Sequence, residues 1–275
     1  MAEQRRPRAL VTGASAGIGE GFARKLAGDG YDLVLVARRE ERLRRLADEL
    51  ASRHGVAADV IVADLAGDEG AGQVEELLRS GDVDLLVNNA GFGTAGEFAR
   101  LPLERELEEL DLNVRALMRL CHAALGPMLA RGRGGIINVA STAAYQPVPF
   151  NATYAASKAF VLHFSEALHE EVRGHGVTVT CLCPGPVRTE FQQVASIDEG
   201  KVPAIAWTSV DSVVETALSA LRGRRAIAIP GLVNVISAAT VRVAPRLLVR
   251  RIAGSMFKNA TGHAADGPRG APPAI

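Results

Sequence analysis

Short apolar runs alternate with helical patterns along most of this chain, and this alternation constrains the fold more than any other feature of the sequence. The second helical pattern is a clear example, because Leu43, Leu46 and Leu50 recur at helical spacing. The predicted strands cover residues 9–12, 31–37, 59–63, 83–88, 135–140 and 177–183. The predicted helices cover residues 17–26, 40–50, 73–79, 103–130 and 152–173.

Strands that alternate with helices form a parallel sheet with helices on both faces. Because crossovers between parallel strands are right-handed, the pattern predicts an α/β fold with a doubly wound parallel sheet of the Rossmann type. No linker-like segment interrupts the pattern, so we expect a single domain over residues 1–258 with a helical extension over about residues 190–258. Residues 259–275 are rich in Gly, Pro and Ala, and we expect a disordered tail there.

Composition narrows the function only a little. Lys and Arg together number 31, as do Asp and Glu, so the formal net charge of zero gives no reason to expect a nucleic-acid partner. The three cysteines, Cys121, Cys181 and Cys183, are too few and too unevenly spaced for a disulfide framework. The absence of a disulfide framework fits a reducing compartment. The N-terminus is polar and lacks the apolar region of a signal peptide. We therefore expect a cytoplasmic protein.

A glycine-rich segment follows the first predicted strand and opens the first predicted helix. It reads Thr12-Gly13-Ala14-Ser15-Ala16-Gly17-Ile18-Gly19. Glycines allow a tight turn and a close approach of the backbone to a pyrophosphate, and unpaired N–H groups at a helix N-terminus favour anions. An ordinary glycine turn is the alternative. The position of the segment at the first strand–helix junction favours dinucleotide binding.

The second predicted strand ends in Ala37-Arg38-Arg39, near the place where proteins that bind NAD carry an acidic residue for the ribose 2′-hydroxyl. This chain has no acidic residue there before Glu40, and its guanidinium groups suit a 2′-phosphate instead. The alternative is that both arginines are solvated at the start of a helix. The missing acid favours NADP(H) as the cofactor, with Arg38 as a binding residue, and NAD(H) stays as the second choice.

Tyr154 and Lys158 are four residues apart, so on a helix both side chains rise from the same face. A free tyrosine has a pKa of about 10 and is a poor acid or base near neutrality. A nearby ammonium favours the phenolate and lowers that pKa, so the pair can transfer a proton near pH 7. Taken alone, the spacing fits an unrelated surface Tyr and surface Lys better than a catalytic pair. Other motifs of the chain are needed to choose between the two interpretations.

These segments together resemble the short-chain dehydrogenase/reductase family, and in particular its NADP-preferring bacterial members. The resemblance rests on an ordered series over about residues 8–189 rather than on one motif. The series consists of Thr12-Gly13-x-x-x-Gly17-Ile18-Gly19, Asp64-Leu65, Asn88-Asn89-Ala90-Gly91, Asn113, Ser141, Tyr154-x-x-x-Lys158 and Pro184-Gly185-x-x-x-Thr189.

The resemblance implies four catalytic residues. Tyr154 would protonate the alkoxide as hydride arrives, and Lys158 would lower the pKa of Tyr154 and hold the nicotinamide ribose. Ser141 would hydrogen-bond the substrate oxygen, and Asn113 would hold a water that links Lys158 to solvent. The resemblance also implies cofactor contacts by Tyr154 and Lys158 and by Gly13, Ser15, Gly17, Ile18, Gly19, Arg38, Asp64, Leu65, Asn89, Ala90, Gly91, Pro184, Gly185, Val187 and Thr189. In that set, Asp64 and Leu65 would flank the adenine and Asn89 would meet the adenosine ribose.

Several polar residues also have simpler interpretations. Ser141 alone fits a helix cap and Asn113 alone fits a polar helix residue, so their case rests on the series. Two histidines on the Tyr154 helix, His163 and His169, have no Cys or carboxylate cluster at metal-ligand spacing, and we predict no metal site. Cys183 fits a packing thiol, because no specific base is evident for it. Four glutamates fit a solvated helix face rather than a catalytic pair: Glu104, Glu106, Glu108 and Glu109.

The chain after Thr189 should close over the substrate, as the resemblance implies. Phe191, Trp207 and the apolar residues 202–206 would line a pocket for a hydrophobic carbonyl compound.

Farther along, no acidic residue occurs between Glu215 and Asp266, whereas eight basic residues fall there together with an apolar run over residues 226–241. The run is too short and too interrupted for a membrane span. We favour packing of this stretch on the core and against another subunit, with its arginines in water. The alternative is a helix with Val241, Leu247, Leu248 and Ile252 that lies on an anionic membrane surface.

The sequence therefore predicts an oxidoreductase that transfers a hydride between NADP(H) and a carbonyl compound or secondary alcohol, such as a hydrophobic ketone or a 3-oxo compound. One alternative is a catalytically silent NADP(H)-binding regulatory protein of the same fold, although such a protein has no need of a tuned proton donor. Another is an NAD-dependent alcohol dehydrogenase. The resemblance also implies a homodimer or homotetramer formed through the predicted helices 103–130 and 152–173.

Overall fold

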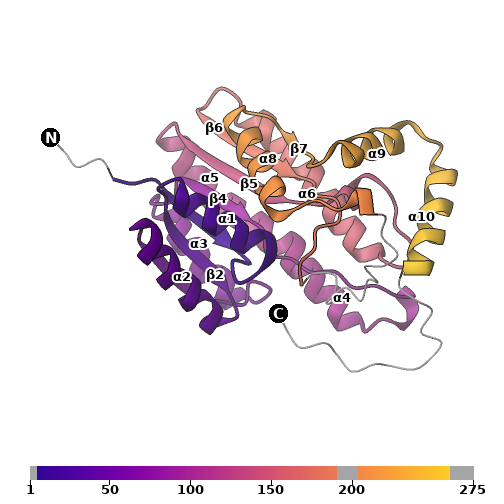
Figure 1. Cartoon of the computed structure of the whole chain (residues 1–275), viewed down its shortest axis with the longest axis horizontal. Helices are drawn as coiled ribbons and strands as arrows, with labels where there is room; N and C mark the ends of the chain where they lie inside the picture. The colour runs from indigo at the N-terminus through magenta and orange to yellow at the C-terminus, as the bar shows by residue number, and fades with distance from the viewer. Residues whose placement is uncertain (1–4, 191–203, 261–275) are drawn as a thin grey trace.

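A parallel sheet of seven strands forms the centre of the computed structural model, which describes residues 5–190 and 204–260 (Figure 1). The strands run in the order β3-β2-β1-β4-β5-β6-β7, and every neighbouring pair is parallel. Their bounds are Arg8–Thr12 for β1, Asp32–Ala37 for β2, Ala58–Val62 for β3, Leu85–Asn88 for β4, Gly134–Val139 for β5, Val177–Leu182 for β6 and Ile227–Ala228 for β7. The predicted doubly wound fold is confirmed, and β7 is a seventh strand that the apolar pattern did not predict.

Helices cover both faces of the sheet. The bounds of the helices in the body of the fold are Gly17–Gly28 for α1, Glu40–His54 for α2, Asp68–Arg79 for α3, Leu103–Leu110 for α4, Leu117–Ala130 for α5, Ala152–Glu171 for α6 and Val210–Arg222 for α8. On one face α1, α2 and α8 bury Phe22, Leu43 and Val213 against the strands. On the other face α3 and α5 bury Leu78 and Leu120, together with residues of α6. Burial on both faces explains why the inner strands read as continuous apolar runs.

The predicted helix over residues 103–130 is interrupted. Between α4 and α5 the chain forms a π-helical segment, η2, over Asp111–Ala116. A π-helical turn closes its hydrogen bonds over five residues instead of four, and such turns occur frequently at functional sites. The segment contains Asn113, which is buried at 1% exposure.

The C-terminal extension contains η5 (Ala204–Ala206), α8, β7, α9 (Leu232–Val243) and α10 (Arg246–Ala260). The single basic helix considered for this stretch is in fact two helices, because Pro245 cannot continue the hydrogen bonding of α9. The last helix ends at Ala260, two residues into the predicted tail, and residues 261–275 lie outside the described part of the chain. Within residues 5–190 and 204–260, no helix combines the length and the apolar character that crossing a membrane requires.

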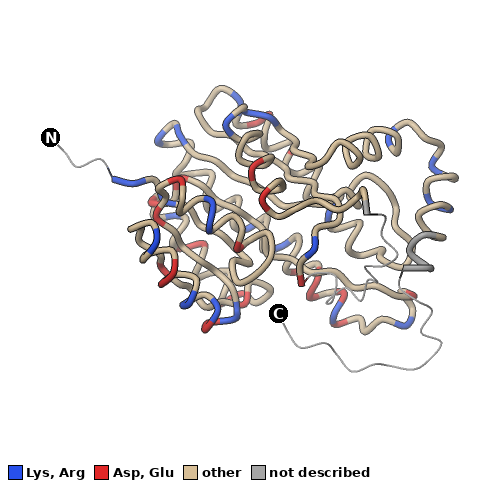
Figure 2. Tube along the Cα trace, viewed as in Figure 1, with Lys and Arg blue, Asp and Glu red and all other residues tan. Residues whose placement is uncertain are grey.

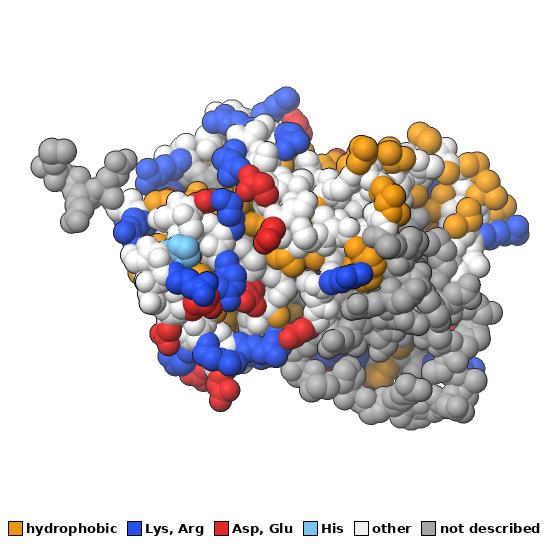
Figure 3. Space-filling model, viewed as in Figure 1, with side chains coloured by type: hydrophobic (Ala, Val, Ile, Leu, Met, Phe, Trp, Pro, Cys, Tyr) orange, Lys and Arg blue, Asp and Glu red, His pale blue; other side chains and the backbone are white. Residues whose placement is uncertain are grey.

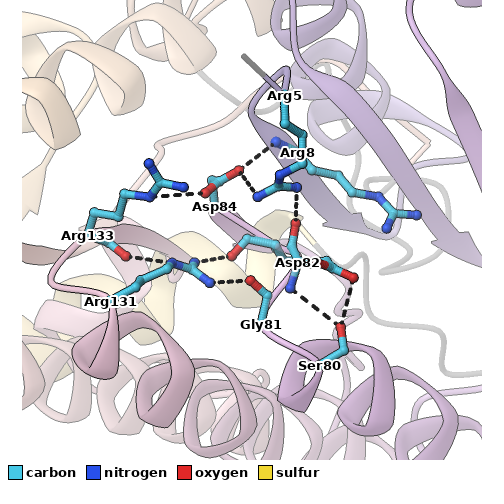
Figure 4. Close-up of polar contacts among 9 residues, drawn as sticks. Arg5, Arg8, Ser80, Gly81, Asp82, Asp84, Arg131 and Arg133 are labelled. Atoms are coloured by element: carbon cyan, nitrogen blue, oxygen red, sulfur yellow. Dashed lines mark hydrogen bonds and ion pairs between the residues drawn. The ribbon is translucent and has the colours of Figure 1, made fainter. Parts of the chain in front are cut away.

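A polar network joins the amino ends of β1, β4 and β5 (Figure 4). Asp84, just before β4, accepts hydrogen bonds from the backbone N–H of Arg8 at 2.9 Å and from the guanidinium of Arg5 at 3.1 Å. The guanidinium of Arg133, just before β5, lies 3.9 Å from the other carboxylate oxygen of Asp84. These contacts hold together the end of the sheet at which the strands begin. Ligands of doubly wound proteins bind at the opposite end of the sheet, at the carboxyl ends of the strands.

Candidate active site

The strand order reverses beside β1, which has β2 on one side and β4 on the other. In this architecture the reversal leaves a crevice outside the carboxyl ends of the two central strands. The loops that follow β1 and β4 meet there, because the Thr12 hydroxyl accepts hydrogen bonds from the backbone N–H groups of Asn89 and Ala90 at 2.9 Å each. The side-chain amide of Asn89 donates to the carbonyl of Thr12 at 3.0 Å. Asn89 therefore ties the two loops together, and Thr12 has a positioning role that its place in the motif did not suggest.

The glycine-rich loop between β1 and α1 is packed too closely for side chains at its key positions. A Cβ on Gly19 would lie 2.2 Å from the carbonyl oxygen of Gly13, which itself has a left-handed φ of +66°. A Cβ on Gly17 would lie 3.0 Å from Cγ2 of Thr189, so the predicted residue Thr189 lies against this loop. Ala16, the N-cap residue of α1, offers no side-chain cap to the first turn of the helix. A bare helix N-terminus behind a close-packed glycine turn fits the pyrophosphate of a dinucleotide.

Arg39 contacts the glycine-rich loop, whereas Arg38 contacts Asp64. The Arg39 guanidinium donates to the hydroxyl of Ser15 at 3.1 Å and pairs with Glu190 at 2.7 Å. The carboxylate of Glu190 also pairs with Arg42 at 2.6 Å. Arg38 is instead 3.7 Å from Asp64, the residue predicted to flank the adenine. The sequence pattern missed Arg42, although it lies one helical turn after Arg39 and could have been found by that spacing.

The remaining predicted cofactor residues surround the same edge of the sheet. Leu65 is buried in the core at 5% exposure, directly after Asp64. Pro184 follows β6 and its carbonyl accepts a hydrogen bond from the N–H of Thr142 at 2.9 Å. Val187 is also buried and forms a bridge to Thr208. The structure thus gathers the predicted residues from the ends of β1, β3, β4 and β6. Ile18 is partly buried and packs against the hydrophobic core on the face of the sheet that α1 covers.

Ser141, Tyr154 and Lys158 meet beside the ends of β5 and β6. Ser141 follows β5 and shares a hydrogen bond with Tyr154 on α6. Its hydroxyl also accepts the N–H of Ala143 at 3.1 Å, so Ser141 caps the short helix η3 (Thr142–Tyr145) as well. The Lys158 ammonium lies 5.7 Å from the centre of the Tyr154 ring and donates to the carbonyl of Val139 at 2.9 Å.

Burial controls the ionisation of both residues of this pair. It raises the pKa of the Tyr154 phenol above its ordinary value, and the hydrogen bond with Ser141 only partly opposes that rise. Burial lowers the pKa of Lys158 to about 8, with the negative charge of Glu109 acting in the opposite direction. Desolvation of the phenol is the largest cause of the raised pKa of Tyr154, and the expected lowering of that pKa by Lys158 stays a prediction.

Asn113 uses its whole side-chain amide to hold neighbouring elements. It donates to the carbonyl of Phe92 at 2.8 Å and to the hydroxyl of Ser157 at 3.1 Å, and it accepts the N–H of Phe92 at 3.1 Å. A Cβ on Gly91 would lie 2.7 Å from the amide oxygen of Asn113 and 3.2 Å from the Lys158 nitrogen. The glycine lets Asn113 and Lys158 approach the same loop, which brings all four predicted catalytic residues into one region.

Two glutamates of α4 belong to this region and not to a solvated face. Glu104 and Glu108 are exposed as expected, but the exposed fractions of Glu106 and Glu109 are only 3% and 0%. The interpretation of all four as surface residues is therefore wrong for this pair. The missed signal is their spacing, because residues 106, 109 and 113 share one helical face with the buried Asn113.

The two buried carboxyl groups share one hydroxyl. The Thr94 oxygen lies 2.5 Å from Glu106 and 2.9 Å from Glu109, and Glu109 also accepts the N–H of Thr94 at 2.8 Å. A hydroxyl has one proton to donate, so both contacts are hydrogen bonds only when one of the carboxyl groups is itself protonated. Burial raises the pKa of Glu109 to about 7, and the contacts with Thr94 and the charge of Lys158 oppose the rise. The second oxygen of Glu109 has no hydrogen-bond partner among the described residues.

The residues after β6 pack against the C-terminal extension. A Cβ on Gly185 would lie 2.4 Å from the Asn234 side chain of α9. Trp207, predicted to line the substrate pocket, has the guanidinium of Arg188 over its ring at 5.3 Å. Cys183 is fully buried, which agrees with a packing thiol. Phe191 and residues 202–203 lie outside the described part of the chain. In the part that is described, no three His, Cys, Asp or Glu side chains are grouped so that they could hold a metal ion.

Comparison with known proteins places this site in a family context. The family model described as short chain dehydrogenase matches residues 7–200. The human protein named inactive hydroxysteroid dehydrogenase-like protein 1 is 35% identical over 186 residues, which cover 66% of this chain and 56% of that protein. The very-long-chain 3-oxoacyl-CoA reductase of Anas platyrhynchos is 33% identical over 195 residues, 68% of this chain and 62% of that protein. The chain thus spans less than two thirds of the length of both relatives.

A solved structure is similar over most of the chain. The short-chain dehydrogenase from Sphingobium yanoikuyae in complex with NADPH superposes with a TM-score of 0.79 at 36% identity. The similarity covers 85% of this chain and 93% of that one.

Proposed function

The chain belongs to the short-chain dehydrogenase/reductase family, and we propose that it transfers a hydride between NADP(H) and a carbonyl compound or secondary alcohol. The observation that carries this proposal is the hydrogen-bonded Ser141–Tyr154 pair with Lys158 beside it, at the carboxyl edge of the sheet. At the same edge, the close-packed glycine turn before α1 fits a dinucleotide.

The protein's part in the chemistry is to hold and move one proton. A bound nicotinamide cofactor supplies the hydride. The Tyr154 phenol is protonated near pH 7 and can therefore donate its proton to the alkoxide formed in a reduction. The Ser141 hydroxyl, already hydrogen-bonded to Tyr154, orients the substrate oxygen toward that proton. The Lys158 ammonium stabilises the phenolate that remains after proton transfer, because opposite charges favour each other's ionised forms.

The arginines beside the glycine-rich loop support NADP(H) as the cofactor. Arg39 and Arg42 converge on the carboxylate of Glu190, which shows that their guanidinium groups suit an anion at this place. A hollow of about 340 Å³ beside Ser15 is lined by Arg24, Arg42 and Arg45 and also by the carboxylates of Glu20 and Glu49. No acidic residue stands at the end of β2 to receive a ribose 2′-hydroxyl, which argues against NAD(H). The NADPH bound to the similar Sphingobium protein is consistent with this assignment.

We propose a hydrophobic ketone or 3-oxo compound as the substrate. The name of the Anas relative, a very-long-chain 3-oxoacyl-CoA reductase, supports this class. A test is the rate of NADPH oxidation with long-chain ketones, cyclic ketones and 3-oxoacyl thioesters against short polar ketones. Faster turnover of the short polar compounds would contradict the assignment.

The Tyr154→Phe variant tests the mechanism and separates it from a catalytically silent protein. We expect unchanged NADPH affinity with a loss of nearly all turnover, because only the transferable proton is removed. Activity equal to that of the wild type would refute the role of Tyr154. A wild-type protein that binds NADPH but turns over no compound of the panel would favour the silent alternative, which the word inactive in the name of the human relative keeps open.

We also propose a cytoplasmic homodimer or homotetramer that associates through α4, α5 and α6. Leu107 and Leu110 of α4 and Met118 of α5 are 51%, 40% and 42% exposed, which supports an apolar contact surface on these helices. Light scattering on the purified chain measures the state, and a monomer at micromolar concentration would exclude a stable oligomer.

A further inference from the structure

The outer side of α9 is an apolar stripe. Asn234 and Ala238 are buried and mark the inner side of this helix. On the opposite side, at spacings of four and seven residues, Leu232, Ile236 and Val243 are 74%, 57% and 85% exposed. A surface helix of a globular protein carries polar residues on its outer side, so this arrangement is reversed.

The following helix extends the apolar surface. Val249 and Ala253 of α10 are buried, whereas Leu247, Leu248 and Ile252 are 44%, 51% and 60% exposed. Figure 3 shows hydrophobic side chains gathered over α9 and α10 at one end of the molecule. A contiguous apolar patch of this kind on a protein surface marks an interaction site.

The charge on the same two helices is of one sign. Arg242, Arg246, Arg250 and Arg251 are exposed, and no acidic residue occurs between Glu215 and Asp266. Figure 2 shows only basic residues among the charged positions of α9 and α10. The Arg242 guanidinium stacks over the ring of Tyr145 at 4.9 Å. Within residues 5–190 and 204–260, no carboxylate pairs with the other three arginines.

We propose that α9 and α10 bind the surface of an anionic lipid bilayer, with the apolar side chains at the headgroup–acyl boundary and the arginines against the headgroups. Exposed apolar side chains beside unpaired basic residues are the signature of a helix that lies in a membrane interface. The positive charge of this surface favours an anionic bilayer over a second copy of the chain as its partner. Two copies that met through this surface would bring like charges together, whereas anionic headgroups neutralise them.

The surface adjoins the candidate active site. Asn234 of α9 faces Gly185, Arg242 covers Tyr145 at the end of the short helix that Ser141 caps, and a Cβ on Gly254 of α10 would lie 3.2 Å from Pro149. If the proposed function holds, docking at this surface would present the substrate side of the site to the bilayer, from which a hydrophobic carbonyl compound could enter. The binding itself does not depend on turnover, so it can be tested without any substrate.

The test is co-sedimentation of the full chain with large unilamellar vesicles. Vesicles of phosphatidylcholine alone are compared with vesicles in which about a third of the lipid is phosphatidylglycerol. We expect binding to the anionic vesicles that is much weaker on neutral ones and falls steeply between 50 mM and 500 mM NaCl, where screening becomes strong. Equal binding to both compositions, or no binding to either, would overturn the proposal.

Variants test the two parts of the surface separately. Ile236→Glu should weaken vesicle binding at least about tenfold, because it places a charge in the apolar stripe. Arg250→Gln with Arg251→Gln should weaken it about 25-fold, since each basic residue near an anionic surface contributes about fivefold. Phe98→Glu, at a position 59% exposed in the short helix η1 (Phe98–Arg100), is the matched control and should bind like the wild type. Circular dichroism and NADPH binding check the fold of each variant.

Two results would give the surface another role. Weakened binding by Phe98→Glu that equals the loss in Ile236→Glu would mean that general charge, and not this surface, controls vesicle binding. An oligomer that Ile236→Glu dissociates, in a protein that binds no vesicles, would assign the surface to a second copy of the chain.

Discussion

Replacing Glu109 with glutamine should stabilise the protein by an amount that increases with pH. Glu109 is fully buried, and burial raises its pKa from the ordinary 4.5 to about 7. The folded chain therefore holds the proton of this carboxyl more tightly than the unfolded chain. Below pH 4.5 the group is neutral in both states and costs nothing. As the pH rises from 4.5 to 7, ionisation of Glu109 lowers the free energy of unfolding. Above pH 7 this loss of stability stays constant at ~3 kcal/mol.

Glutamine has nearly the same shape as glutamate and its oxygen can still accept the N–H of Thr94, but it does not titrate. The stability of Glu109→Gln relative to the wild type should accordingly increase by about 2.5 kcal/mol between pH 5 and pH 8. Urea unfolding at four pH values across this range measures the difference from the midpoint and the slope. Groups that do not interact with Glu109 titrate equally in both proteins, so their contributions cancel, whereas the pKa of Lys158 falls further in the variant because the charge of Glu109 is lost.

Glu108→Gln is the control, because Glu108 is on the same helix but exposed, where it pairs with Arg105. A surface pair of this kind contributes about 0–1 kcal/mol, with little dependence on pH over this range. A Glu109→Gln difference that stays within ~0.5 kcal/mol from pH 5 to pH 8 would refute the raised pKa of Glu109.

Three further predictions concern the cofactor loop. Arg38→Ala and Arg39→Ala should each weaken NADPH binding more than NADH binding in fluorescence titrations, with about tenfold or more for Arg39→Ala because its guanidinium lies over Ser15; equal losses for both nucleotides would contradict the NADP(H) assignment. Glu190→Gln should tighten NADPH binding several-fold, since its carboxylate now occupies Arg39 and Arg42, and an unchanged Kd would show that it does not compete with the 2′-phosphate. Gly19→Ala should abolish the thermal shift caused by NADPH and lower stability by about 1–3 kcal/mol, because its Cβ would lie 2.2 Å from a carbonyl oxygen. Gly72→Ala, on a helix with no atom within 4 Å of the added Cβ, is the control and should leave the thermal shift intact.

The strands of the sheet were predictable because each inner strand is buried on both faces. Residues 9–12 and 83–88 read as apolar runs bounded by polar or glycine positions, and β1 and β4 fall within a residue or two of those bounds. The short β7 has only two residues, Ile227 and Ala228, and pairs only at the edge of the sheet with β6. Two residues give no periodicity, so only the tertiary pairing makes them a strand.

The side-chain environments on α4 were not predictable in the same way. Glu104, Glu106, Glu108 and Glu109 are chemically alike and close in sequence, yet two are exposed and two are buried beside Thr94. Whether each glutamate is buried depends on the π-helical segment and on the loop from Gly91 to Thr94, which comes from another part of the fold. Helical spacing to Asn113 could have suggested the buried pair, but only if Asn113 was already known to face inward.

The sequence by itself determined the order of strands and helices, the loop that fits a dinucleotide and the identity of four residues suited to proton transfer. The order of the elements and the loop follow from local spacing and residue chemistry, whereas the four residues follow from the resemblance to the family. The tertiary structure decided the ionisation of the buried groups: it raised the pKa values of Tyr154 and Glu109 and lowered that of Lys158. It also placed Arg39 rather than Arg38 over the loop. These outcomes depend on burial and on contacts between distant segments, which no local pattern specifies.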